Sequence, residues 1–191
     1  MYKPDFLNTY QSSANETAVY PGRFGERTEC ALVGLFYVSL GLSGEIGELQ
    51  EKIIGNADKD AITKELGDVY WYISQVCMEL NLPMGYLTKI KVEYKNLRKI
   101  SDFSVERYLL ALSILSGRIC EILKKTLRDN NGHLQPQKKE DMIKILAKIL
   151  YNMLGVCGVC DCDPQEVMNI NIEKLFSRKE RGVLQGSGDN R

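Results

Sequence analysis

The apolar residues of this chain recur at three- and four-residue spacing along most of its length, and this pattern constrains the fold more than any other feature. Such spacing places apolar side chains on one face of an α-helix, whereas the alternation expected of half-buried strands is almost absent. The prolines lie between these stretches, where a helix can begin or end. They are Pro4, Pro21, Pro83, Pro136 and Pro164. The sequence therefore predicts an all-α protein.

The same pattern gives approximate boundaries for the helices. We expect an amphipathic arm at about residues 5–18, which ends in a turn at Tyr20–Gly22. The helices that we expect next cover about residues 29–54, 60–81, 84–99, 103–127, 138–160 and 164–180. Gly55 and Asn56 are residue types that commonly end a helix, which supports the first of these boundaries.

Two parts of the chain match each other. Residues 43–49 align with residues 116–122, and residues 65–82 align with residues 145–162 after a connector that is longer in the second copy. A pair of helices cannot bury its apolar faces alone, so two such hairpins should pack together. We therefore predict a four-helix-bundle core built from two tandem helical hairpins, which is a pseudo-dimer within one chain.

The repeat also predicts how the chain is divided. The boundary between the two copies falls near residues 98–103. We expect a first unit at residues 1–100, which carries an acidic motif, and a second unit at residues 101–191, which carries a basic motif.

The acidic motif consists of two carboxylate pairs, Glu45 with Glu48 and Glu65 with Asp68. Residues three apart share a helix face, so a short antiparallel turn could bring the pairs together. Four clustered carboxylates repel each other and are stable only when protonated or neutralised by a hard cation. Oxygen ligands at this density suit Mg²⁺ or Mn²⁺, and Mg²⁺ usually binds together with a substrate phosphate. Glutamate pairs are also common on solvated helix faces, but these pairs lie among apolar and glycine residues.

The basic motif lies near the C-terminus. Asn171, Lys174 and Arg178 are spaced so that they form one helical stripe, and Arg181 follows them. Lysine supplies a point charge and arginine a fork of donors, both of which suit a polyphosphate, although ordinary surface charge would give the same pattern.

The second copy has lost the acidic pattern. Three of the four positions that are acidic in the first copy are here Arg118, Ile145 and Lys148, and only Glu121 is kept. We therefore expect at most one metal centre per chain. A complete site would combine the carboxylates of the first copy with the basic stripe of the second.

Composition excludes several classes of partner. The chain has 25 Lys and Arg against 25 Asp and Glu, and its pI is about 6.6, so it lacks the basic field that a polynucleotide requires. The first residues contain no apolar signal core, and the longest apolar stretch, about residues 31–42, is too short to cross a bilayer. We expect a cytoplasmic protein without a membrane segment.

The six cysteines should then be reduced thiols. Cys157, Cys160 and Cys162 suggest a zinc or redox site at first sight. The repeat aligns Cys160 and Cys162 with Leu80 and Leu82, which favours a role in packing.

These motifs together resemble the MazG family of all-α nucleoside triphosphate pyrophosphohydrolases. The resemblance is carried by Glu45-x-x-Glu48, sixteen intervening residues and Glu65-x-x-Asp68, and by segments 41–44 and 66–72 around them. Residues 10–11 with 17–21 resemble the N-terminal arm of phage and bacterial members. Their C-terminus is resembled by residues 171–175, 177–183 and 186–191. Family members usually have one such unit and pair as dimers, so the acid-less second copy is a departure.

The resemblance implies hydrolysis of a nucleoside triphosphate between the α and β phosphates, which gives a monophosphate and pyrophosphate. Glu45, Glu48, Glu65 and Asp68 would hold Mg²⁺ or Mn²⁺, and Glu48 is our choice of general base. The substrate-binding residues that we expect are Asn171, Lys174, Arg178 and Arg181. A homodimer of pseudo-dimers is a possible assembly.

Two other functions fit the same residues. One is a dUTP- or dCTP-specific pyrophosphatase of the same all-α superfamily, whose base contacts cannot be identified from one sequence. The other is a non-catalytic helical protein that senses nucleotides or binds a partner. Loss of the acids in only one copy favours an enzyme, since drift should have eroded both.

Overall fold

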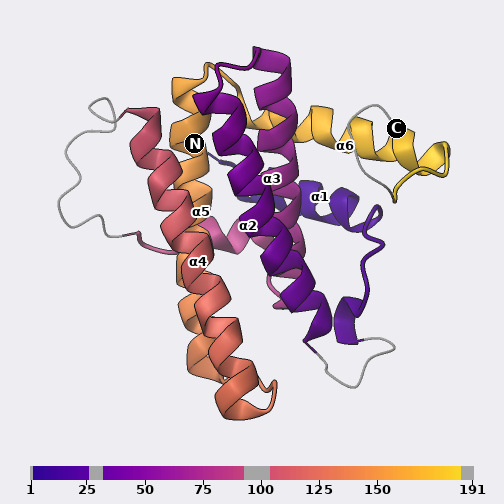
Figure 1. Cartoon of the computed structure of the whole chain (residues 1–191). Helices are drawn as coiled ribbons and strands as arrows, with labels where there is room; N and C mark the ends of the chain where they lie inside the picture. Colours follow the sequence, from indigo (N-terminus) through magenta and orange to yellow (C-terminus); the bar gives the residue numbers. More distant parts are fainter. Residues whose placement is uncertain (1, 26–31, 93–103, 186–191) are drawn as a thin grey trace.

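The computed structural model describes residues 2–25, 32–92 and 104–185, and the regular elements in these ranges are all helical (Figure 1). The α-helices are α1 (Pro4–Asn15), α2 (Val33–Ile54), α3 (Lys59–Glu79), α4 (Val105–Asn130), α5 (Pro136–Val159) and α6 (Pro164–Glu180). Two short 3₁₀-helices are η1 (Arg23–Gly25) and η2 (Met84–Lys89). The all-α prediction is confirmed.

Two helical hairpins form the centre of the molecule. In Figure 1, the α4–α5 hairpin lies on one side of the α2–α3 hairpin, and α1 and α6 lie on the other side. The apolar faces of the hairpins form one core, which includes the fully buried Leu66 and Ile73 of α3 and Ile149 and Met153 of α5. Helix α3 is therefore covered from both sides, and it contacts α1 and α6 as well as α2 and α5.

Helix α5 shows why hydropathy alone is a poor guide to membrane insertion here. Pro136–Val159 is long and apolar enough to cross a bilayer by length and composition. However, 61% of its apolar window is buried inside the fold, as expected of a central core helix.

The ends of α3 and α5 have the same backbone arrangement. Asn81 and Asp161 both adopt left-handed conformations, with φ of 51° and 53°. In each case the next N–H donates to the carbonyl five residues earlier, that of Cys77 or Cys157, at 2.9 Å. This geometry agrees with the alignment of residues 65–82 with 145–162, and the internal repeat itself stays a prediction.

One predicted helix is different in the structure. We expected a helix at residues 84–99, but within the described part, residues 84–92, the chain forms the 3₁₀-helix η2 and is extended at Ile90. Helix α1 lies directly against η2, because Asn8 Oδ1 accepts from the Gly85 N–H at 2.7 Å. A Cβ atom at Gly85 would come within 2.4 Å of the Pro4 carbonyl, so α1 can pack this closely only on a glycine. Residues 93–99 and the predicted unit boundary at 98–103 lie outside the described residues.

Candidate metal and substrate site

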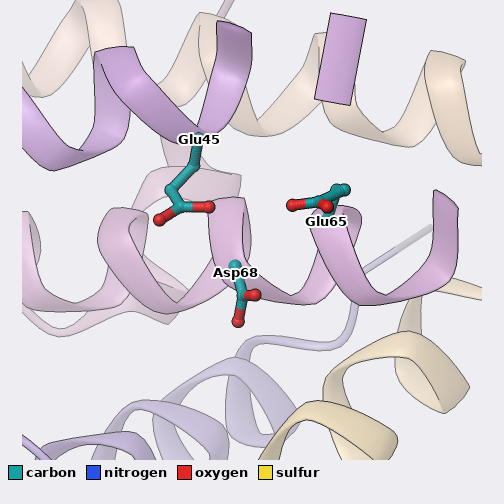
Figure 2. A group of neighbouring side chains, drawn as sticks. All are labelled: Glu45, Glu65 and Asp68. Atoms are coloured by element: carbon teal, nitrogen blue, oxygen red, sulfur yellow. The ribbon is translucent and has the colours of Figure 1, made fainter. Parts of the chain in front are cut away.

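Three carboxylates meet between the two helices of the α2–α3 hairpin. Glu45 projects from α2, and Glu65 and Asp68 project from α3 (Figure 2). One oxygen from each lies within 4.8 Å of the others. The predicted turn therefore does bring the two acidic pairs together, for three of their four members.

The turn between α2 and α3 sets this register. Asn56 adopts a left-handed conformation, with φ of 53°, and the Ala57 N–H donates to the Lys52 carbonyl at 2.9 Å. Asp58 then caps α3 by accepting from the Ala61 N–H at 2.8 Å. These local contacts fold α3 back along α2, which places Glu45 opposite its partners on α3.

The electrostatics of this cluster favour a bound cation. Burial raises the pKa of Glu45 to about 8, and the negative charges of Asp68, Glu48 and Glu65 add to the shift. Lys174 offsets part of it. Burial and the neighbouring acids thus keep Glu45 protonated at neutral pH. A divalent cation bound beside it would stabilise the ionised form. A site with carboxylate donors only suits hard cations such as Mg²⁺ and Mn²⁺.

Glu48 lies at the edge of the cluster. It is exposed and does not belong to the three carboxylates that converge, although its charge contributes to the raised pKa of Glu45. The residue faces solvent because it lies on the outer side of α2, away from the apolar face formed by Leu42, Ile46 and Leu49. Its predicted roles as fourth ligand and general base stay predictions.

Helix α6 approaches Asp68 from the other side. Lys174 Nζ lies 2.7 Å from both carboxylate oxygens of Asp68, and Asn171 Nδ2 donates to Oδ1 at 2.9 Å. Gly67 makes this approach possible, because a Cβ atom there would lie 2.8 Å from that of Asn171. Residues of the acidic motif and of the basic stripe therefore meet at one carboxylate.

The remaining basic residues separate. The Arg178 side chain is buried and lines a pocket beside the acidic cluster. Arg181 is exposed, and its Nε donates to the Ser177 carbonyl at 3.2 Å. The structure thus brings Lys174 and Arg178 to the site, uses Asn171 to hold Asp68, and leaves Arg181 on the surface.

The pocket has a volume of about 410 Å³, and Glu45 and Asp68 form part of its wall. Much of the rest is aromatic: Tyr20, Tyr37, Trp71 and Tyr72. Tyr20 stacks on Tyr37 with ring centroids 5.5 Å apart, and Trp71 meets Tyr72 edge to face at 4.9 Å. The arrangement joins an acidic end, a buried guanidinium and flat apolar surfaces in one cavity.

Comparison with known proteins agrees with this geometry. A family model described as the MazG nucleotide pyrophosphohydrolase domain matches residues 38–102. The chain is 33% identical over 107 residues to the Gene 37 protein of Mycobacterium phage L5, a match that covers 50% of this chain and 86% of that protein. The chain belongs to the MazG family. No solved structure matches it.

The MazG match contains the whole acidic motif and helix α3. Helices α1, α4, α5 and α6 lie outside the matched segment. The parts of the site that α6 supplies are therefore features that the structure adds to the matched segment.

The aromatic wall was only partly evident in the sequence. Tyr70, Trp71 and Tyr72 follow Asp68 and could stack a base, but the sequence favours core packing for at least two of them. In the structure, Trp71 and Tyr72 line the pocket. Tyr70 is instead fully buried in the core. Tyr20 and Tyr37 carried no functional signal in the sequence. The segment that contains Tyr20 reaches the pocket only through long-range packing. Its Tyr20 hydroxyl donates to Glu79 Oε1 at 2.6 Å, near the end of α3.

Proposed function

We propose that this protein is a Mg²⁺-dependent nucleoside triphosphate pyrophosphohydrolase that cleaves NTP or dNTP substrates between the α and β phosphates. The observation that carries the proposal is the meeting of Glu45, Glu65 and Asp68 beside a pocket with a cationic and an aromatic wall. Membership of the MazG family supplies the reaction class.

Glu45, Glu65 and Asp68 would hold the cation, with Glu48 available at the exposed edge of the cluster. A bound Mg²⁺ would offset the charge of the phosphates and make a nearby water more acidic. Mn²⁺ suits the same donors.

The protein's own side chains would orient the triphosphate and handle the proton. Arg178, in the pocket wall, would bind phosphate oxygens with its planar fork of donors, and Lys174 would add a point charge next to Asp68. These charges would stabilise the departing pyrophosphate. Glu48 would accept the proton of the attacking water, since it is exposed and close enough to Glu45 to influence its pKa.

The aromatic wall would hold the nucleobase by stacking. Two of its polar groups already bond within the protein, because Tyr20 OH donates to Glu79 and Trp71 Nε1 donates to Thr17 Oγ1 at 3.1 Å. Stacking discriminates weakly among bases, since every base has a π face. We therefore expect tolerance of several bases, as in a house-cleaning enzyme, rather than strict selection of dUTP or dCTP.

The remaining expectations follow from the charge balance and the fold. We expect a cytoplasmic enzyme that acts on free nucleotides, binds neither polynucleotides nor membranes, and assembles as a homodimer of pseudo-dimers.

The deciding experiment measures pyrophosphate release from a panel of NTPs and dNTPs with Mg²⁺. We expect a monophosphate and pyrophosphate in equal amounts, and loss of both products with EDTA. Hydrolysis of dUTP or dCTP alone would replace the proposal with the specific pyrophosphatase. If no nucleotide is hydrolysed, a non-catalytic nucleotide sensor or partner-binding protein becomes the better interpretation.

A further inference from the structure

Tyr10, on helix α1, is connected to the acidic cluster through a single side chain. Its hydroxyl donates to Asn171 Oδ1 at 2.9 Å, and Nδ2 of the same amide donates to Asp68 Oδ1 at 2.9 Å. Tyr10 is 3% exposed and Asn171 is 2% exposed, so water does not compete for these bonds. Helices α1, α3 and α6 therefore meet in one chain of hydrogen bonds that ends at a carboxylate of the site.

Only one orientation of the Asn171 amide satisfies both neighbours. An ionised Asp68 can only accept, so the NH₂ end must face it, and the carbonyl end then needs a donor. Tyr10 supplies that donor. Burial and the negative charge of Asp68 raise the pKa of Tyr10 well above its usual value, so the phenol keeps its proton at neutral pH. Without the hydroxyl, Asn171 Oδ1 would be left buried and without this bond.

We propose that Tyr10 is a positioning residue: it fixes the orientation of the Asn171 amide, which holds Asp68 in the geometry that binds a divalent cation. The inference rests on the proposed metal site, and it gives α1 a role in that site although α1 lies outside the segment that matches the family model. Removing the hydrogen-bond partner of a metal ligand typically lowers metal affinity or activity 10- to 100-fold.

The first test measures Mn²⁺ binding to the full-length protein by electron paramagnetic resonance. We expect Tyr10→Phe to weaken Mn²⁺ binding about tenfold. Tyr70→Phe is the matched control, because Tyr70 is also buried and its hydroxyl bonds to the Tyr2 hydroxyl at 2.6 Å, away from the acids. The control should bind Mn²⁺ as the wild type does. At saturating Mn²⁺, Tyr10→Phe should lower kcat and leave KM unchanged.

A double-mutant cycle asks whether Tyr10 acts through Asn171. Once Asn171→Ala has removed the amide, adding Tyr10→Phe should cause no further loss of Mn²⁺ affinity. A second measurement needs no metal and follows hydrogen exchange of the Asn171 side-chain amide by NMR. The signals of this amide are identified as those that disappear in Asn171→Ala. Their hydrogen exchange should be at least about tenfold faster in Tyr10→Phe than in the wild type.

The outcomes separate this inference from the proposed function. Equal Mn²⁺ affinity in the wild type and Tyr10→Phe, or an additive loss in the Asn171→Ala background, would overturn the inference and leave the metal site standing. Mn²⁺ binding that depends on Tyr10 in a protein that hydrolyses no nucleotide would overturn the proposed function alone. A wild type that binds no Mn²⁺ would overturn both.

Discussion

The two central hairpins place acidic residues in opposite electrostatic environments. In the α2–α3 hairpin, three carboxylates lie within 4.8 Å of one another, and the pKa of Glu45 is raised to about 8 by burial and by its acidic neighbours. In the α4–α5 hairpin, hydrogen bonds and charge from Lys124 and Lys125 lower the pKa of Glu121. The first arrangement opposes ionisation, whereas the second favours it.

The second hairpin shows that a hairpin of this kind does not need the acidic cluster to fold. In the alignment, Ile145 takes the place of Glu65 and is buried in the core, and Lys148 takes the place of Asp68. The like charges of the cluster cost stability in the first hairpin, and the second hairpin folds without them. A requirement of folding therefore does not explain why the cluster is present. The comparison therefore favours a functional origin for the carboxylates of α2 and α3.

The largest expected effect comes from removing a metal ligand. Asp68→Ala should lower pyrophosphohydrolase activity by more than about 100-fold, since loss of a ligand should exceed the effect of losing an outer-shell partner. Lys148→Ala, at the aligned position of the second hairpin, should leave activity nearly unchanged. Steady-state kinetics of both variants test the comparison, and similar losses in the two would contradict it.

The second prediction concerns the stability of the metal-free protein as a function of pH. The unfolded chain releases the Glu45 proton near pH 4.5, whereas the folded protein retains it to about pH 8. The folded state thus binds more protons in this window, and the free energy of unfolding should fall as pH rises through it. The total decrease should be on the order of 3 kcal/mol, allowing for partial exposure of Glu45.

Urea denaturation in EDTA between pH 5 and 9 measures this decrease. Glu45→Gln should remove most of the slope, and saturating Mg²⁺ should flatten it because the cation replaces the proton. A wild-type protein whose stability is independent of pH in EDTA would show that the carboxylates do not repel each other as described.

The sequence predicts the acidic cluster well because its determinants are local. Helical spacing and a short turn suffice to bring Glu45, Glu65 and Asp68 together, and the all-α class follows from the same periodicity. The placement of Glu48 could not be read in this way, since its exposure depends on how far around α2 the neighbouring helices reach. Tyr20 and Tyr10 were missed for a related reason: they reach the site through packing of α1 and of the segment that follows it, which leaves no local pattern.

A smaller effect is expected from removing Lys174, the α6 lysine that contacts Asp68 of the first hairpin. Lys174→Ala should raise KM for a nucleoside triphosphate about tenfold, which corresponds to about 1.4 kcal/mol of binding free energy. Lys124→Ala is the control, because this lysine pairs with Glu121 of the second hairpin. If Lys174→Ala has wild-type kinetics, the basic stripe has no part in the site.

The smallest expected effect is on the melting temperature, and it compares Glu121 with Glu45. Glu121 is paired with lysines that lie three and four residues later in α4, so Glu121→Gln should lower the melting temperature by about 1 °C or less. Glu45→Gln should shift it in the opposite direction in EDTA at pH 9, because it removes a charge that its neighbours repel. Thermal denaturation of both variants at low ionic strength measures the two signs, and high salt should weaken the Glu121 effect first because that pair is exposed. If both substitutions destabilise the metal-free protein at pH 9, the two hairpins do not differ in the way that their side chains indicate.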